Sequence, residues 1–332
     1  MSAASQSSVR VRFAPSPTGF LHVGGARTAI YNWLFRQRMG GALILRIEDT
    51  DRARSDDAMT RQIQDALRWL GVTWDEGPHL QSERVERHAA RAHELVESGR
   101  AYACFCSSQE LDSKRAEAGA AGHGFLYPRT CLALARDEVE RRLAHGEPHI
   151  VRFLMPRENT RFTDLLRGDL DIPPDALDDF ILVRSDGSPT YHLSVVSDDI
   201  DMGITHVVRG DDHLSNTPKH IRLFEALGAP VPVFAHLPLI LGPDRKRLSK
   251  RTGATSVEEF RAQGVLPQAL FNYLALLSWT PPGGQELLSK DEMAPLFALE
   301  RISAAPSIFD TAKLLWFNGR YISTLPIDEL MH

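Results

Sequence analysis

Apolar and polar positions alternate over residues 9–13, and a loop rich in proline and glycine follows at residues 14–19. This pattern predicts a buried strand that ends in a tight loop. Apolar residues then recur at helical spacing, at Ala26, Ala29, Ile30, Trp33 and Leu34. The pattern therefore predicts a strand, a loop and a helix in direct succession.

The loop before this helix ends in His22, Gly24 and Gly25. Free backbone N–H groups and the positive end of the helix dipole favour an anion at such a terminus. The glycines let an anion approach the backbone closely, and His22 adds a hydrogen-bond donor. We therefore expect a phosphate-binding site here, although a loop histidine beside a helix can equally be a solvated cap.

The same patterns extend along the chain. Strands are predicted at residues 42–47, 150–153 and 205–209, a strand pair at residues 233–241, and a hairpin at residues 180–191. Helices are predicted from a Ser55 cap to Gly71, from a Ser82 cap to Gly99, from a Thr217 cap to Gly228, from a capping box at residues 256–259, and over residues 267–277. We read the chain as an open α/β sheet, and Glu48 and Asp49 follow a strand where such sheets bind ligands. A solvated acidic turn is the other interpretation.

Composition sets broad limits on the class of protein. At 332 residues, two or three domains are expected, and 43% apolar with 24% charged residues is typical of a soluble globular protein. The net charge of −5 argues against indiscriminate coating of nucleic acid, but basic residues cluster at 245–247 and 250–251. No apolar run approaches the roughly 20 residues of a membrane helix, and the polar residues 1–8 lack the apolar centre of a signal peptide. We expect a cytoplasmic protein without membrane contact.

The three cysteines, Cys104, Cys106 and Cys131, do not make a disulfide framework. Two cysteines one residue apart with a third further on can hold a tetrahedral zinc ion. Tyr127 or His123 would have to supply the fourth ligand. The alternative is that the cysteines are small buried apolar residues.

Two segments resemble the signatures of the class I aminoacyl-tRNA synthetases. Residues 22–25 read His-Val-Gly-Gly, similar to the His-Ile-Gly-His motif, and the preceding residues 14–19 resemble the glutamyl branch. Residues 247–250 read Arg-Leu-Ser-Lys, similar to the Lys-Met-Ser-Lys loop. The resemblance covers nearly the whole chain after the polar tail.

The resemblance implies a Rossmann-like nucleotide-binding fold that is split by an α+β insertion and followed by helices that contact the tRNA stem. The expected limits are a disordered tail at 1–8, the first catalytic half at 9–105, an insertion that binds the acceptor end at 106–190, the second half at 191–252, and the helical domain at 253–332. The helical anticodon-binding domain of full-length bacterial relatives is expected to be absent. We also expect a monomer.

The resemblance further implies ATP- and Mg²⁺-dependent activation of L-glutamate and its transfer to tRNA(Glu). His22 and Lys250 would supply charge at the reacting phosphate. Residues implied to bind ATP are Thr18, Gly19, His22, Gly24, Gly25, Asp212, Arg247, Ser249 and Lys250. Residues implied to bind glutamate are Arg12, Ala14, Ser16, Glu48, Tyr191 and Arg209. Glu48 would hold the α-ammonium group, and the two arginines would take the two carboxylates in an order that stays open.

Two departures and three alternatives accompany this interpretation. Relatives often complete the zinc site with a histidine at the position of Ala133, and some carry asparagine at the position of Val195. The first alternative is a glutamyl-queuosine tRNA(Asp) synthetase, which has the same pattern of cysteines and a tyrosine at the position of Tyr127. Against it, residues 249–254 resemble the full glutamyl-tRNA synthetase. The glutaminyl branch differs in the first loop at Ser16 and Thr18. A non-catalytic tRNA-binding module would have no need of His22 and Lys250.

Overall fold

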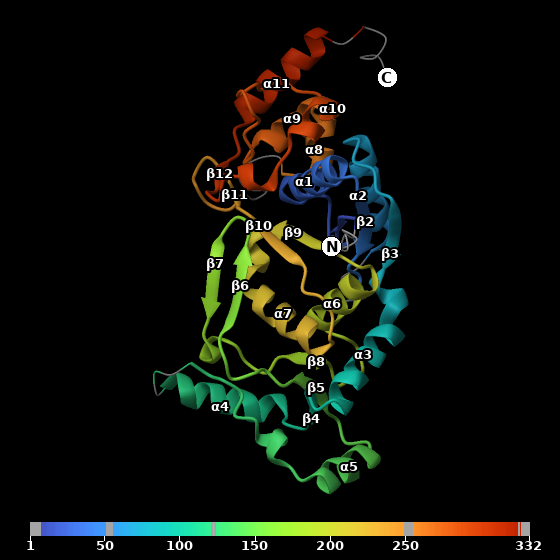
Figure 1. Ribbon diagram of the computed structural model, residues 1–332, viewed down its shortest axis with the longest axis vertical. Coiled ribbons are helices and arrows are strands. Elements are labelled where there is room, and N and C mark those ends of the chain that lie inside the picture. Colours follow the sequence, from blue (N-terminus) through green and yellow to red (C-terminus); the bar gives the residue numbers. More distant parts are fainter. Residues whose placement is uncertain are drawn as a thin grey trace, which may run out of the picture.

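The computed structural model describes residues 8–50, 56–120, 122, 124–248, 255–324 and 326. Ser249 and Lys250 of the second signature lie outside the described residues, as do Ser55 and His123. The molecule is elongated, with a central parallel sheet, helices near the C-terminus at one end, and α4 and α5 at the other (Figure 1). The predicted α/β class is confirmed.

The central sheet comes from both halves of the chain. A parallel sheet has the order β1 (Arg10–Phe13), β2 (Ala42–Ile47) and β3 (Glu76–Leu80). Strands β9 (His206–Gly210) and β10 (Val233–Leu237) pair in parallel and adjoin β1, where the N–H of Thr205 donates to the carbonyl of Arg10 at 2.9 Å. The carboxyl ends of β1, β2 and β9 therefore face one shared edge, as predicted for a ligand site in an open sheet.

Helix α1 (Val23–Met39) begins immediately after the predicted loop and is buried along most of its length. Its apolar residues pack on the central sheet, and the Tyr31 hydroxyl donates to the carbonyl of Ala275 at 3.1 Å. Helix α2 (Asp57–Trp69) contributes Ile63 and Leu67 to the same apolar core, whereas α3 (Val85–Glu97) contributes Ala92 and Leu95 to a second one. The first signature thus opens a helix that is clamped between the sheet and the C-terminal helices.

The helix caps predicted for α2 and α3 are both wrong. Helix α2 is capped by Asp56, whose carboxylate accepts the N–H of Ala58 at 2.7 Å, rather than by Ser55. Ser82 lies in the 3-10 turn η1 (Gln81–Arg84), and its N–H and hydroxyl donate to Asp49 at 2.8 and 2.6 Å. A side chain committed to a distant carboxylate is not available to cap its own helix. The Asp49 carboxylate is therefore bound to Ser82, which gives it a structural role.

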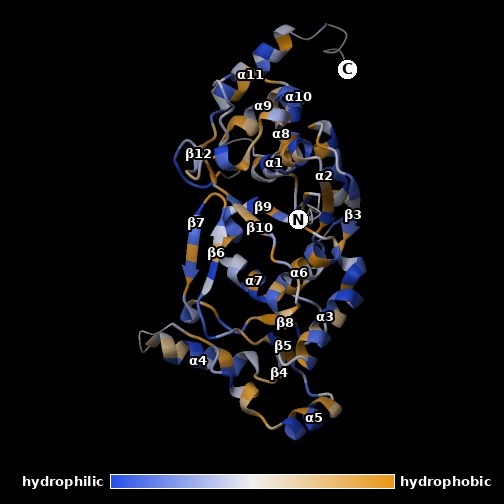
Figure 2. Ribbon diagram, viewed as in Figure 1, coloured by the Kyte–Doolittle hydropathy of each residue, from blue (hydrophilic) through white to orange (hydrophobic). Residues whose placement is uncertain are grey.

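The middle of the chain contributes two further groups of strands. An antiparallel sheet has the order β4 (Ala101–Cys104), β5 (Ile150–Phe153) and β8 (Ile181–Val183). The hairpin of β6 (Thr160–Asp164) and β7 (Gly168–Ile172) instead joins the second half of the central sheet, in the order β7-β6-β10-β9. Helices α4 (Ser108–Ala120) and α5 (Arg136–Ala144) project from this region, and α5 has no buried residue and largely hydrophilic colours (Figure 2).

The hairpin predicted at residues 180–191 is only partly present. Its turn forms at Asp186 and Gly187, but the returning arm makes a single bridge, between Val183 and Pro189. Proline has no N–H to continue a ladder, and Tyr191 already begins α6 (Tyr191–Asp201). Tyr191 therefore enters the site from the first turn of a helix and not from a strand.

The C-terminal part packs against α1. Its elements are β11 (Ile240–Leu241), α8 (Val257–Ala262), α9 (Pro267–Leu276), α10 (Lys290–Met293), β12 (Ser307–Ile308) and α11 (Thr311–Thr324). The predicted capping box of Ser256 and Glu259 is confirmed. Strands β11 and β12 pair in parallel, which ties the second-signature region to the helices. Among the described helices, none combines the length and the apolar character that crossing a bilayer requires.

Candidate active site

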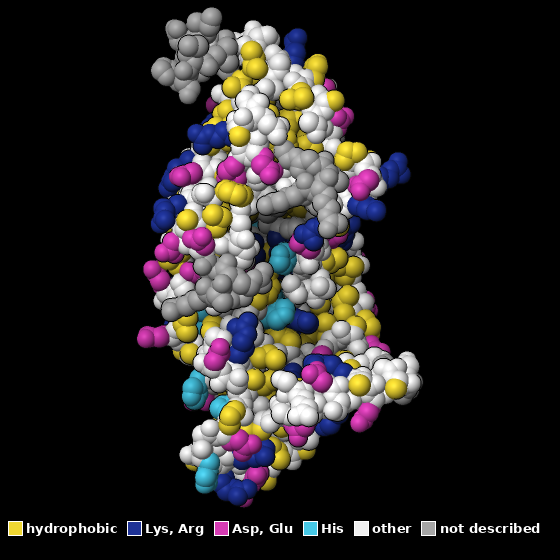
Figure 3. All heavy atoms as spheres, turned by 180° about the vertical axis from the view of Figure 1, so that it is seen from behind, with side chains coloured by type: hydrophobic (Ala, Val, Ile, Leu, Met, Phe, Trp, Pro, Cys, Tyr) yellow, Lys and Arg dark blue, Asp and Glu magenta, His cyan; other side chains and the backbone are white. Residues whose placement is uncertain are grey.

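A cavity of about 500 Å³ opens at the shared carboxyl edge of β1, β2 and β9. Figure 3 shows a hollow at mid-height of the molecule, with histidine side chains at its border. The cavity gathers most of the predicted site residues: Arg12, Ala14, His22, Gly24, Gly25, Glu48, Tyr191, Arg209, Asp212 and Arg247. Ser16, Thr18 and Gly19 belong to the adjoining loop but do not line the cavity.

His22 is the N-cap of α1. Its extended backbone (φ −71°, ψ 150°) lets Nδ1 accept the N–H of Gly24 at 3.2 Å. Desolvation, followed by the positive charge of Arg247, lowers the pKa of His22, so the imidazole is neutral at pH 7. With Nδ1 acting as acceptor, the ring proton lies on Nε2. His22 thus offers the cavity a hydrogen-bond donor on Nε2.

The two signature regions are tied together by their backbones. The N–H of Val23 donates to the carbonyl of Thr255 at 2.9 Å, and the N–H of Val257 donates to the carbonyl of Leu21 at 2.9 Å. These bonds lie on both sides of His22, at the point where the chain leaves the second signature. The start of α1 is therefore held directly against residues 255–257.

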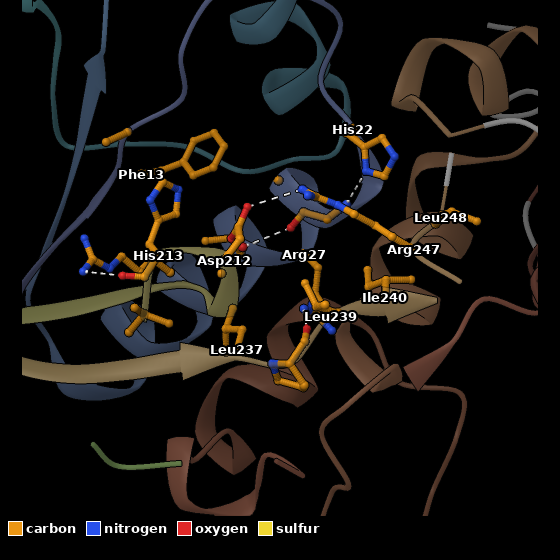
Figure 4. Close-up of a pocket in the computed structure, with 18 of the residues that line it drawn as sticks. Phe13, His22, Arg27, Asp212, His213, Leu237, Leu239, Ile240, Arg247 and Leu248 are labelled. Carbon is orange, nitrogen blue, oxygen red and sulfur yellow. Dashed lines mark hydrogen bonds and ion pairs between the residues drawn. The ribbon is translucent and has the colours of Figure 1, made fainter. Parts of the chain in front are cut away.

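Arg247 reaches across the mouth of the cavity to Asp212, with 3.3 Å between Nη2 and Oδ2 (Figure 4). Asp212 lies in the 3-10 turn η4 (Asp211–Asn216) directly after β9. Both side chains are exposed, at 72% and 43%, so this ion pair contributes little stability. The pair can exchange one partner for a charged ligand at low cost.

A buried ion network forms the floor of the cavity. Arg46 donates to Asp199 at 2.6 Å and lies 3.4 Å from Glu48, while Nε of Arg12 donates to Asp199 at 3.2 Å. Burial raises the pKa of Glu48 even though Arg46 and Arg12 act in the opposite direction. A cationic ligand beside Glu48 would favour its carboxylate form. The floor is therefore suited to an ammonium group.

Arg209, on β9, is surrounded by neutral acceptors. Its Nε donates to Nε2 of His236 at 3.1 Å and its Nη1 lies 3.3 Å from Nδ1 of His220. Its Nη2 donates to the hydroxyl of Thr217 at 2.8 Å and to the carbonyl of His213 at 3.2 Å. Burial lowers the pKa of each of these three histidines, so they are neutral at pH 7.

Within the part of the chain that the structure describes, no carboxylate lies within salt-bridge distance of Arg209. The guanidinium is only 6% exposed, and this burial lowers its pKa. A buried cation whose partners are all neutral attracts an anion. Thr217, predicted as a helix cap, follows the actual N-cap Asn216 in α7 (Thr217–Ala226) and binds Arg209 instead.

His213 is a cavity residue that the sequence interpretation missed. Its Nδ1 lies 3.1 Å from the Tyr191 hydroxyl, and the two rings stack with centroids 5.7 Å apart. Burial and then the charge of Glu48 raise the pKa of Tyr191 to about 12, so the phenol keeps its proton. The sequence offered one indication of its role, because His213 directly follows Asp212 at the carboxyl end of a predicted strand.

The three cysteines meet in a second cluster, remote in the fold from the cavity. Their sulfur atoms all lie within 4.8 Å of one another, with 3.6 Å between Cys106 and Cys131. The Tyr127 hydroxyl lies 3.2 Å from Sγ of Cys104 and 3.3 Å from Sγ of Cys106. Four donors around a zinc ion at about 2.3 Å would be separated by about 3.8 Å, so these donors fit a tetrahedral zinc.

The fold and the cavity are those of a class I tRNA synthetase catalytic domain. Residues 8–316 match the family described as tRNA synthetases class I (E and Q), catalytic domain. The chain is 52% identical to glutamate–tRNA ligase 2 of Koribacter versatilis (strain Ellin345) over 333 residues, which cover 100% of this chain and 69% of the relative. It is 50% identical to the glutamate–tRNA ligase of Aquifex aeolicus (strain VF5) over 328 residues, 98% of this chain and 69% of the relative. The chain therefore belongs to the glutamate–tRNA ligase family of class I aminoacyl-tRNA synthetases.

A solved structure agrees with this assignment. The crystal structure of a glutamate tRNA ligase from Elizabethkingia meningosepticum in complex with its amino acid superposes with a TM-score of 0.91 and 37% identity. The match covers 96% of this chain and 70% of that one. The family and fold inferred from the two signatures are thus confirmed.

Proposed function

We propose that this chain condenses L-glutamate with ATP to glutamyl-adenylate in the cavity and transfers the glutamyl group to the 3′-terminal adenosine of tRNA(Glu). The relatives at about half identity are named as ligases of glutamate and tRNA. The observation that carries the proposal is the position of Arg209, a buried cation with neutral partners, in the same cavity as His22 at the α1 N-terminus.

The charged groups of glutamate match the charged side chains at the floor of the cavity. The α-ammonium group lies beside Glu48, with the Tyr191 hydroxyl nearby, and the two carboxylates take Arg12 and Arg209. Arginine suits this task because its planar fork binds a carboxylate through two parallel hydrogen bonds. Ala14 and Ser16 of the first loop complete the glutamate side.

ATP lies along the N-terminus of α1, next to Thr18, Gly19, Gly24 and Gly25 of the first signature. In the activation step one oxygen of the α-carboxylate of glutamate bonds to the α-phosphorus of ATP. The bond between the α-phosphorus and the α,β-bridging oxygen breaks, and the β- and γ-phosphates leave as pyrophosphate. His22 donates a hydrogen bond to the phosphate, while Arg247 and Lys250 supply positive charge there. Ser249 of the same signature is assigned to ATP binding with them. Asp212 offers the oxygen donor that suits hydrated Mg²⁺, which neutralises the pyrophosphate when bound.

Transfer of glutamate needs a bound tRNA. We assign its acceptor end to the segment 106–190 and its stem to the helices after residue 252, with the two halves of the catalytic domain at 9–105 and 191–252. Contacts of this kind bind phosphates and fix the register of the tRNA without reading its sequence. A monomeric state and a cytoplasmic location belong to the same proposal.

The cysteine cluster is proposed as a structural zinc site. Cys104, Cys106 and Cys131 are the sulfur ligands, and Tyr127 fills the fourth position where many relatives carry a histidine. A bound zinc ion would join β4 to the turn at Thr130–Ala133 and so brace the segment that meets the acceptor end.

Charging of an unmodified tRNA(Glu) transcript with labelled glutamate tests the proposal. We expect ATP-dependent attachment to the transcript, and none to a tRNA(Asp) transcript. A glutamyl-queuosine enzyme needs a modified base that a transcript lacks, so it would label neither RNA and label only native tRNA(Asp). That outcome, or binding of tRNA without any labelling, would replace the proposal with one of its two alternatives.

A further inference from the structure

A chain of three buried side chains leads from the β6–β7 hairpin to the amino-acid end of the cavity. Asp164, at the end of β6, lies 2.6 Å from Nδ1 of His236 on β10, and Nε2 of His236 accepts Nε of Arg209 at 3.1 Å. Asp164, His236 and Arg209 are 1%, 0% and 6% exposed. The first two residues do not line the cavity, and neither was identified from the sequence.

The contacts determine which nitrogen of His236 carries the proton. A guanidinium Nε can only donate, so Nε2 of His236 must be the acceptor, and the proton lies on Nδ1, facing Asp164. Burial keeps the pKa of His236 below its ordinary value despite the bond to Asp164. Although burial disfavours the carboxylate, hydrogen bonds from His236 and the Leu166 N–H keep the pKa of Asp164 low. The pair is therefore an anionic carboxylate and a neutral imidazole.

Asp164 is held firmly enough to impose this arrangement. Its Oδ1 accepts the N–H of Leu166 at 2.9 Å and the N–H of Arg167 at 3.0 Å, which leaves Oδ2 for the imidazole. Thr217 closes the contact on the other side, because its hydroxyl lies 3.0 Å from Nε2 of His236 and accepts Nη2 of Arg209 at 2.8 Å. The orientation of the guanidinium is thus fixed by neutral acceptors.

A neutral cradle has a specific advantage for recognising an anion. A carboxylate placed directly on Arg209 would orient it equally well, but it would cancel the charge and compete with the ligand. An imidazole between Asp164 and Arg209 keeps the anion one ring away from the guanidinium. The guanidinium then meets the ligand already oriented and without a counter-ion, which reduces the cost of binding.

We propose that His236 and Asp164 are positioning residues for amino-acid recognition: Asp164 fixes the tautomer of His236, and His236 aims Arg209 at a substrate carboxylate without neutralising it. This inference rests on the proposed role of Arg209 in binding glutamate. It adds two residues, from β6 and β10, to the determinants of glutamate affinity.

Substituting His236 by asparagine or by glutamine tests its two hydrogen bonds one at a time. His236→Asn keeps a donor near Asp164 and loses the acceptor for Arg209, whereas His236→Gln places an acceptor near Arg209 and loses the bond to Asp164. We measure glutamate-dependent ATP–pyrophosphate exchange with the tRNA(Glu) transcript present. His236→Asn and Asp164→Asn should raise KM for glutamate roughly 10-fold or more, because a buried charged donor loses its partner. His236→Gln should stay within about threefold of the wild type, and KM for ATP should change little in all three.

A double-mutant cycle and a matched control separate positioning from general loss of structure. In an Arg209→Ala background, Asp164→Asn should raise KM no further, because its effect passes through Arg209. Tyr102→Phe removes a buried hydrogen bond to another carboxylate outside the cavity, in which the Tyr102 hydroxyl donates to Asp179 at 2.7 Å. It should lower the melting temperature and leave KM for glutamate unchanged.

The outcomes distinguish the inference from the function on which it rests. An unchanged KM in Arg209→Ala would overturn the proposed role of Arg209 itself. A raised KM in Arg209→Ala with unchanged KM values in His236→Asn and Asp164→Asn would overturn only the inference. Equal effects of Asp164→Asn in both backgrounds, or a raised KM in Tyr102→Phe, would do the same. If Asp164→Asn does not fold, the comparison of His236→Asn with His236→Gln tests the inference alone. Equal KM values for glutamate in these two variants would contradict it.

Discussion

The carboxylate of Asp199 lies 2.6 Å from Nη1 of Arg46, and the two side chains are 2% and 0% exposed. The same carboxylate accepts Nε of Arg12 at 3.2 Å. One buried anion therefore orients both the arginine beneath Glu48 and an arginine that we assign to the substrate. The glutamate pocket and the stability of the catalytic half depend on the same group.

Asp199→Asn should destabilise the protein strongly. Removing one member of a buried ion pair leaves the other charge uncompensated, which costs about 3–5 kcal/mol. Urea unfolding measures the loss. Asp65→Asn, which breaks the exposed pair with Arg68, is the control and should leave the midpoint unchanged. Similar small effects of both substitutions would show that Arg46 and Arg12 have other sufficient partners.

Glu48→Gln should weaken glutamate binding and yet improve stability at neutral pH. Burial raises the folded-state pKa of Glu48, so its unfavourable ionisation removes stability as the pH rises from about 4.5 through the folded-state pKa. Glutamine does not ionise, and its advantage over the wild type should grow across that window. Unfolding free energies at several pH values test the sign. An advantage that shrinks as the pH rises would mean that Arg46 and Arg12 outweigh burial.

His22→Asn and His22→Ala should separate the cap from the chemistry. Asparagine is a good N-cap, so it should preserve stability, whereas alanine should cost roughly 1 kcal/mol. Both remove the Nε2 donor and should lower the rate of ATP–pyrophosphate exchange by roughly 10²–10³. Full activity of the asparagine variant would limit His22 to capping α1.

Protein purified without chelator should contain one zinc per chain by elemental analysis. Cys131→Ser should lose the metal, because Cys131 provides one of the three sulfur donors that face one another within 4.8 Å. Clearly less than one zinc per wild-type chain would leave the cluster as a set of packed thiols.

Local patterns predicted the parts of the site that depend on neighbouring residues. The β1 strand, the α1 helix and the position of His22 follow from alternation, a proline-rich loop and helical spacing within residues 9–34. The capping box of Ser256 and Glu259 was equally local. Arg209 and Asp212 were assigned through the resemblance to the class I synthetases, and the strand predicted at residues 205–209 placed them at its carboxyl end.

Long-range partners were beyond such patterns. His220 and His236 on α7 and β10 resemble ordinary packing residues until the fold brings both to Arg209. Ser82 has the local sequence features of a helix cap. Its actual partner, Asp49, lies 33 residues away, where no local pattern could indicate it. The β6–β7 hairpin joins β10, which no turn or periodicity could show. At Ser82 and Thr217, a distant polar group outweighed the local preference for a cap.

Glutamate–glutamine discrimination tests the central claim most directly. The two amino acids differ only at the side-chain carboxylate, and a buried guanidinium left facing an amide lacks its anionic partner. ATP–pyrophosphate exchange is measured with each amino acid in the presence of tRNA(Glu) transcript. The account predicts saturable exchange with glutamate and background exchange with glutamine. Comparable exchange with both, or none with glutamate, would contradict it.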